Sequence, residues 1–185
     1  MTTTTDIPGY KAGTWVLDAS HSEVGFSVRH MMISKVRGTF AVAEATIVAP
    51  ENPLELTLDA KVDVASINTK DEGRDNHLRS ADFFDVENYP NITFVSTGVR
   101  QQGGDFLVDG DLTIKDVTKP VTFEVEFGGF GTDPWGNYKA GATAKTVINR
   151  EEFGLTWNAA LETGGVLVGK DVTINLDLQA ALQQD

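Results

Sequence analysis

The chain has 185 residues and a formal net charge of -12, and it contains no cysteine. Its length fits one domain with a full core, and its charge and the absence of any Lys/Arg-rich run argue against nucleic acid as a partner. Without cysteine there is no disulfide framework, no thiolate nucleophile and no Cys-based zinc site.

The N-terminal segment has neither the basic leader nor the apolar stretch of a secretory signal. No segment approaches the roughly 18 to 20 continuous apolar residues of a membrane span. We therefore expect a cytoplasmic protein with no membrane span. Residues 1–12 are expected to form a flexible N-terminal extension, and residues 13–185 a single domain.

Alternation of apolar and polar residues predicts β-strands along the whole chain. Between residues 22 and 30, Val24, Phe26 and Val28 alternate with polar residues or glycine. Similar patterns predict strands over residues 14–18, 35–48, 54–64, 91–99, 106–114, 121–127, 138–148 and 172–179. The chain is therefore expected to form about eight or nine strands.

Strands with one apolar face must cover that face, either with a second sheet or by closing on themselves. Closure also removes the exposed sheet edges, and the short connections favour an antiparallel meander barrel. A barrel of about eight strands has room for side chains or for one ligand. Size alone does not decide between a filled barrel and a hollow one.

One segment has the features of a helix. Thr69 and Glu72 have the spacing of a capping box, which predicts a helix that starts near Lys70. Asp75 and Arg79 lie at i and i+4 and support a helix that ends near Ser80. We expect this short helix to plug one end of the barrel.

A second irregular stretch, residues 149–170, contains Phe153, Leu155 and Trp157 and the pair Gly164-Gly165. It is expected to form a flap over the opposite mouth of the barrel.

Catalytic groups are poorly represented. Asp18, His21 and Ser22 supply the residue types of a hydrolytic triad, but they lie within one turn between strands, which gives no reason for triad geometry. Asp109 and Asp111 share the parity of an outward strand face, where solvated carboxylates are ordinary. The three histidines have no short metal-ligand spacing, so no metal is expected.

Two features indicate a ligand. His30 is the next alternate residue after Val24, Phe26 and Val28, so it should lie on the same inward face as these apolar residues. Ala140, Ala142 and Ala144 follow one another on the inward face of their strand and leave volume unfilled. Phe123, Val125 and Phe127 on the neighbouring strand could fill that volume, because tight cores alternate large and small residues. Both interpretations of the alanine face stay open.

Several motifs together resemble the YceI-like, or polyisoprenoid-binding, proteins. The matching residues are WVLD at 15–18, HS at 21–22 with Val24, Phe26, Val28 and His30, GTF at 38–40, HLRSADFFDVENYPNITFVST at 77–97, DLTI at 111–114, VTKPV at 117–121, FGL at 153–155, and VG at 168–169 with Val172. The resemblance runs from Gly13 to Ala180, and its most specific part is the run at 77–97.

The resemblance implies an all-β, antiparallel, lipocalin-like barrel whose deep apolar pore holds a long isoprenoid chain, such as a polyprenyl compound or an isoprenoid quinone. The residues expected to bind this ligand are Val24, Phe26, Val28, His30, Phe94, Phe106, Val108, Phe123, Val125, Phe127, Ala140, Ala142, Ala144, Trp157, Ile174 and Leu176. His30, Arg74 and His77 are the candidates for contact with a polar head group. No cofactor is required, the partner is an apolar small molecule, and a homodimer is left open.

Three function classes remain at this point. The first is a protein that binds, stores or transports the lipid without catalytic residues. The second is an enzyme that acts on a lipid or small molecule in the pore, and the third is a stress-related barrel that acts through its outer surface.

Overall fold

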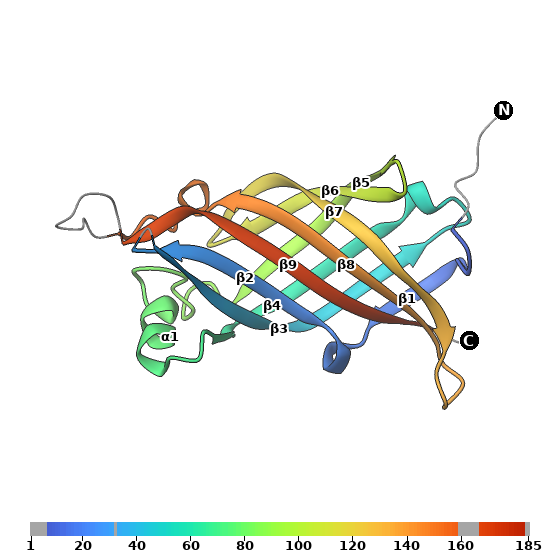
Figure 1. The fold of residues 1–185 in the computed structure, drawn as a ribbon, viewed down its shortest axis with the longest axis horizontal. Coiled ribbons are helices and arrows are strands. Elements are labelled where there is room, and N and C mark those ends of the chain that lie inside the picture. The colour runs from blue at the N-terminus through green and yellow to red at the C-terminus, as the bar shows by residue number, and fades with distance from the viewer. Residues whose placement is uncertain (1–6, 32, 159–166, 184–185) are drawn as a thin grey trace.

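The computed structural model describes residues 7–31, 33–158 and 167–183 (Figure 1). The strands in these ranges are β1 (Gly13–Leu17), β2 (Glu23–His30), β3 (Ser34–Ala49), β4 (Thr57–Asn68), β5 (Asn91–Gln102), β6 (Asp105–Ile114), β7 (Val117–Thr132), β8 (Tyr138–Asn149) and β9 (Val168–Leu182). The helical elements are α1 (Glu72–Arg79) and the 3-10 helices η1 (Ala19–His21), η2 (Pro53–Glu55) and η3 (Arg150–Phe153). The prediction of eight or nine strands and one short helix is confirmed.

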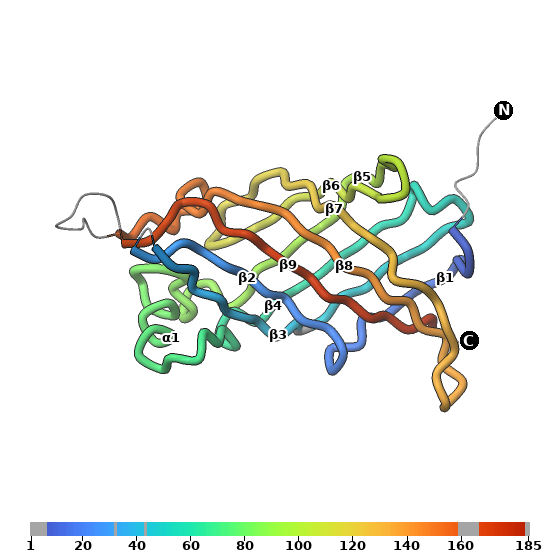
Figure 2. Tube along the Cα trace, viewed as in Figure 1, coloured from blue at the N-terminus to red at the C-terminus, as the bar shows by residue number. Residues whose placement is uncertain are grey.

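The strands close into an antiparallel barrel. Their order is β1-β3-β2-β9-β8-β7-β6-β5-β4, and pairing of β3 with β4 closes the ring. β1 and β2 together occupy one strand position of that ring. Each of them pairs with both β3 and β9, and the two pair at different positions along the length of those strands. Nine strands therefore form a barrel of eight positions, which Figures 1 and 2 show as a long cylinder whose strands run obliquely to its axis.

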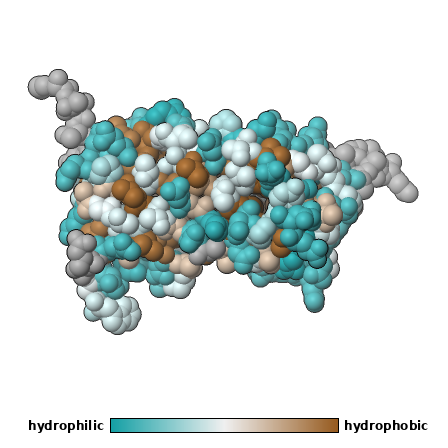
Figure 3. All heavy atoms as spheres, turned by 180° about the vertical axis from the view of Figure 1, so that it is seen from behind, coloured by the Kyte–Doolittle hydropathy of each residue, from teal (hydrophilic) through white to brown (hydrophobic). Residues whose placement is uncertain are grey.

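The alternation in the sequence is the alternation between the two faces of the barrel wall. In β6, for example, Phe106, Leu112 and Ile114 are buried, whereas Asp105 and Asp111 are exposed. The outer surface accordingly carries mostly hydrophilic side chains, with apolar patches between them (Figure 3). The apolar side chains thus point into the barrel, where a ligand site is expected.

Connections in a meander barrel alternate between its two ends. The connection after β4, which contains α1, and the connection after β8, which begins with η3, therefore lie at the same end, called here the helix end. The rings of His77 and Trp157 meet there, with centroids 4.8 Å apart. The prediction of a flap over the opposite mouth is wrong. Gly164 and Gly165 of that flap lie outside the described residues.

The predicted start of the helix is wrong by two residues. Lys70 has a φ of 64°, which is not helical, and Asp71 is the N-cap, whose carboxylate accepts from the backbone N–H of Arg74 at 3.0 Å. Thr69 donates instead to Asp75, from its backbone N–H at 2.9 Å and from its hydroxyl. The predicted end near Ser80 is confirmed. Among the described residues, no helix has the length and apolarity needed to cross a membrane.

The N-terminal extension predicted over residues 1–12 is described from residue 7 onward, and residues 1–6 lie outside the described residues. In the described part, the Tyr10 hydroxyl donates to the carbonyl of Pro50 at 2.5 Å. The Tyr138 hydroxyl donates to the carbonyl of Gly9 at 2.6 Å. Residues 9 and 10 are thus attached to the barrel end opposite α1.

Candidate functional site

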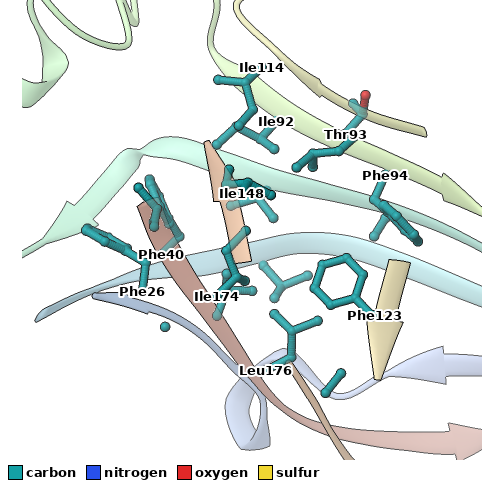
Figure 4. Close-up of a pocket in the computed structure, with 18 of the residues that line it drawn as sticks. Phe26, Phe40, Ile92, Thr93, Phe94, Ile114, Phe123, Ile148, Ile174 and Leu176 are labelled. Atoms are coloured by element: carbon teal, nitrogen blue, oxygen red, sulfur yellow. The ribbon is translucent and has the colours of Figure 1, made fainter. Parts of the chain in front are cut away.

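A cavity of about 230 Å³ lies inside the barrel. Its wall is formed by residues of all nine strands, and it extends toward the helix end, where Leu78, Phe83, Phe84 and Leu155 cover it. Among the described residues that line it, all except Thr93 and Arg150 are apolar or glycine. Figure 4 shows the rings of Phe26, Phe40, Phe94 and Phe123 around this space. Such a wall can hold an apolar chain and offers few partners to a polar molecule.

Two glycines let aromatic rings lie flat against the wall. A Cβ atom on Gly38 would collide with the ring of Phe26, and one on Gly110 would collide with the ring of Phe94. Gly38 is the cross-strand partner of Phe26 in the pairing of β2 with β3. A ring that lies over a glycine occupies the space that a side chain would take and leaves the middle of the barrel open.

Most of the residues predicted from the sequence line this cavity. They come from six strands and are Val24, Phe26, Val28, Phe94, Val108, Phe123, Val125, Ala144, Ile174 and Leu176. Their contact with a ligand stays a prediction.

Three residues predicted to line the pore lie instead at the end opposite α1. Phe106 and Phe127 have ring centroids 5.3 Å apart, and Phe127 stacks on Phe130 at 6.2 Å. Ala140 packs in the cluster formed around Trp15 and Phe130. Trp15 and Tyr138 complete this aromatic plug, which is defined by Trp15, Phe106, Phe127, Phe130 and Tyr138. The plug fills the interior at this end, so these inward positions do not line the cavity.

The alanine face of β8 is divided between the two environments. Ala144 is buried and lines the cavity, whereas Ala140 packs against the aromatic plug. Ala142 lies between them, with Phe127 and Leu178 as its cross-strand partners. Both interpretations of this face are therefore realised, each at a different level of the barrel.

The cover at the helix end was predicted only in part. Phe153 and Leu155 were assigned to a flap at the opposite mouth, and the contribution of Phe83 and Phe84 was missed. Phe83 and Phe84 follow α1, and Phe153 and Leu155 follow β8; all four belong to or pack against the main apolar cluster. They lie in connections, where no strand or helix period marks an inward face. The adjacent pair Phe83-Phe84, in a segment otherwise rich in polar residues, was the available signal.

Arg150 is the one charged residue among the described residues that line the cavity, and sequence reasoning missed it too. It is 3% exposed, and burial lowers its pKa. Its guanidinium donates to the carbonyls of Gly169 at 2.7 Å, Leu155 at 2.5 Å, Trp157 at 3.0 Å and Val168 at 3.2 Å. These bonds join the connection after β8 to the start of β9, and they place a positive charge beside the apolar cavity.

The predicted head-group residues all lie at the helix end, but none of them lines the cavity. Arg74 donates to Thr69, from Nε to the hydroxyl and from a terminal nitrogen to the carbonyl, both at 2.8 Å. His77 lies 2.9 Å from a carboxylate oxygen of Asp82. His30 ends β2 and is half-buried. Trp157 also lies outside the lining, with its ring 5.3 Å from that of Phe83, which does line the cavity.

The residues of the triad considered above do not form one. The Nδ1 atom of His21 lies 2.8 Å from Asp18 and 3.1 Å from the Ser20 hydroxyl, so one ring nitrogen faces both partners, whereas a triad uses two. Ser22 is bonded to the backbone of Gln179 in both directions. Hydrogen bonds from Ser20, His21 and Lys139 hold the pKa of Asp18 far below its usual value. Among the described residues, no three His, Asp or Glu side chains gather as a metal site would require.

Comparisons with known proteins agree with this architecture. Residues 15–180 match the YceI-like domain family. A UPF0312 protein of Staphylococcus aureus strain USA300 is 40% identical over 172 residues, which cover 92% of this chain and 98% of that protein.

Solved structures with the same fold include BcnA of Burkholderia cenocepacia, at 25% identity and a TM-score of 0.76 over 88% of this chain and 98% of that one. The YCEI protein of Campylobacter jejuni is 29% identical, with a TM-score of 0.70 over 84% and 90% of the two chains. A domain of Saccharophagus degradans described as polyisoprenoid-binding shares the fold at 16% identity, with a TM-score of 0.68 over 94% and 100%.

Proposed function

The chain belongs to the YceI-like family, and we propose that its barrel binds an elongated isoprenoid-type lipid, a polyprenyl compound or an isoprenoid quinone, for storage or transport. The observation that carries this proposal is the cavity inside the barrel, whose wall is apolar apart from Thr93 and Arg150. The description of the Saccharophagus degradans domain as polyisoprenoid-binding supports it.

The binding free energy would come from removing the chain of the lipid from water. Each buried methylene contributes about 0.8 kcal/mol, so one five-carbon unit contributes roughly 3 to 4 kcal/mol before ordering costs are subtracted. A few such units give tight binding. One missing methylene changes affinity by only about 1 to 3 kcal/mol, so this wall would accept a family of related chains.

The lipid would enter with its tail toward the aromatic plug and its polar end at the helix end. His77, beside Phe83, and the positive charge of Arg150, whose guanidinium is bonded to four carbonyls, favour this direction. Arg74 is a weaker candidate for the head group than His77, because its guanidinium is engaged with Thr69.

Organic extraction of the purified protein, followed by mass spectrometry, tests the proposal because it reports both occupancy and chemical identity. Protein produced in a lipid-containing cell should release an isoprenoid in a near-equimolar amount. The matched control is an Ala144→Phe variant, purified in the same way, whose ring projects into the cavity and should exclude the chain. An empty cavity in repeated preparations, together with no uptake of added polyprenol, would remove the proposal.

A further inference from the structure

The connection between β2 and β3 exposes apolar side chains at the helix end. Met31 is 44% exposed and Ile33 is 80% exposed. These two residues are called the hairpin tip. A turn that simply reverses the chain in water favours polar residues, Gly or Pro, whereas this turn presents two neighbouring apolar side chains that an apolar partner could cover.

Three exposed cations lie just behind the hairpin tip. Arg29 of β2 and Lys35 of β3 are direct cross-strand partners, and Arg37 lies two residues further along β3 on the same face. Like charges placed directly opposite each other destabilise a sheet unless an anion compensates them. The chain has no Asp or Glu between residues 24 and 43, although its net charge is -12. These three side chains are called the basic collar.

The hairpin tip lies at the end of the barrel that covers the cavity. His30, which precedes the tip, pairs with Val168, and Val168 lines the cavity. The cover formed by Phe83 and Leu155 is at this same end, as Figure 1 shows for α1 and the start of β9. An object bound at the tip would therefore lie beside the place where a ligand enters.

We propose that the hairpin tip and the basic collar dock the protein on an anionic lipid surface, with Ile33 and Met31 inserted among the acyl chains and the collar against the head groups. This inference rests on the proposed function, since docking would bring the cavity next to the membrane from which the lipid is taken. Apolar side chains flanked by cations are the combination that an anionic interface binds.

The opposite end of the barrel offers a weaker candidate. Trp135 is 83% exposed in the connection between β7 and β8. Its neighbour Asp133 accepts hydrogen bonds from the backbone N–H groups of Asn137 and Trp135, which lower the pKa of its carboxyl group. An ionised carboxylate beside the ring would be repelled by anionic head groups. Trp135 therefore serves as the matched control.

Flotation with vesicles tests the docking. Vesicles of phosphatidylcholine with one quarter phosphatidylglycerol should carry the parent protein, and pure phosphatidylcholine or 0.5 M salt should release most of it. Ile33→Asp should lower the partition coefficient about tenfold or more. The triple change Arg29→Gln, Lys35→Gln and Arg37→Gln should lower it on the order of 100-fold. The controls are Trp135→Asp and the charge-matched triple change Lys11→Gln, Lys61→Gln and Lys145→Gln, which should each stay within about twofold of the parent.

A second measurement separates docking from lipid binding. Uptake of retinol, a fluorescent isoprenoid, is followed from ethanol dilution and from the same anionic vesicles. The hairpin-tip and collar variants should take up retinol normally from ethanol and slowly from vesicles.

Normal uptake by a parent protein that does not float would overturn the docking and leave the cavity function intact. Docking is also overturned if Trp135→Asp, rather than Ile33→Asp, abolishes flotation. It is overturned as well if the hairpin tip mediates self-association of the protein that Ile33→Asp abolishes. Flotation with no retinol uptake would support docking and count against the cavity function alone.

Discussion

The rings of His77 and Trp157 pack edge to face, with centroids 4.8 Å apart and 86° between their planes. Phe83 completes the group, at 5.1 Å from His77 and 5.3 Å from Trp157. Through these rings α1 is joined to the connection after β8. Since Phe83 also lines the cavity, the three rings form part of the layer between the cavity and solvent at the helix end.

Removal of the Trp157 ring should therefore ease exchange of the ligand. Trp157→Ala deletes two ring contacts of a half-buried side chain, and we expect a stability loss of about 1 to 2 kcal/mol, below the range of a fully buried tryptophan. Release of bound retinol, followed by stopped-flow fluorescence, should become roughly tenfold faster, which corresponds to about 1.4 kcal/mol. Trp135→Ala at the opposite end should leave release unchanged. Equal release rates for all three proteins would show that the ligand does not leave past this layer.

Arg150 should be among the most important polar side chains for stability. Arg150→Met retains much of the apolar stem but leaves the carbonyls of Gly169, Leu155, Trp157 and Val168 without this donor. Buried acceptors left unpaired cost about 1 to 3 kcal/mol each, so we expect a loss of about 3 kcal/mol or more in the free energy of unfolding, visible as a lower urea midpoint.

The control for Arg150 is Arg100→Met. Arg100 is bonded twice to Asp109, at 2.7 Å each, but its side chain is 57% exposed. An exposed ion pair is worth about 0 to 1 kcal/mol. Similar urea midpoints for the two variants would mean that Arg150 is not a structural anchor of the helix end.

Two alanines of β8 provide a paired test of where the barrel is hollow. Ala140→Phe places a ring against the aromatic plug and should cost about 1 to 3 kcal/mol through overpacking. Ala144→Phe places the same ring in the cavity, so ligand-free protein should keep its stability while retinol uptake is lost. Both must be compared after removal of lipid, because a bound ligand stabilises the native state. If Ala144→Phe is the destabilised variant, or if it binds retinol as the parent does, Ala144 does not face an open cavity.

The sequence predicted which residues of each strand face inward, but not how far along the barrel axis each of them lies. Alternation placed Phe106, Phe123 and Ala144 correctly on inward faces. Alternation says nothing about position along the barrel axis. Phe106 of the plug and Phe123 of the cavity wall were therefore both predicted to line the cavity. That distinction depends on the stagger between strands, which pairs Phe106 with Val125 and Phe127 with Ala142.

Connections were the least predictable part of the site. Leu155 and Arg150 lie outside any periodic segment, and their inward positions follow from hydrogen bonds between the backbone and a buried guanidinium. The position of the segment after β8 could have been predicted, because a meander brings every second connection to the same end. Thr69 satisfied the capping-box spacing by sequence, but its hydroxyl pairs with Asp75, and Asp71 caps the helix.

Acid should weaken the turn after β1 over a defined range of pH. The pKa of the Asp18 carboxyl is lowered by the hydroxyl of Ser20, then by His21 and Lys139, so the ionised form is favoured in the folded state. Such a group contributes stability above the pKa of the unfolded chain, about 3.9, and the contribution is lost as pH falls through the lower folded value. The stability difference between the parent and Asp18→Asn should be constant from pH 7 to about 5 and shrink toward pH 2.

Asp109 provides a second case at the outer wall, where Arg100 and then Thr122 lower its pKa to about 2. The side chains of Asp18 and Asp109 keep 21% and 30% of their surface exposed, so solvent screens both carboxylates and each effect should be about 1 kcal/mol or less. Urea titrations at pH 5, 3.5 and 2.5 measure it. A stability difference between the parent and Asp18→Asn, or between the parent and Asp109→Asn, that does not change with pH would contradict the assigned hydrogen bonds.

Native mass spectrometry of delipidated protein titrated with a C20 isoprenoid alcohol tests binding in the cavity most directly. We expect saturable uptake of one molecule per chain by the parent and by Ile33→Asp, and none by Ala144→Phe, because only the last change fills the cavity bounded by Phe94, Phe123 and Leu176. A parent protein that stays empty at saturating alcohol, or an Ala144→Phe variant that binds as well as the parent, would contradict the claim that this barrel is a container for an isoprenoid chain.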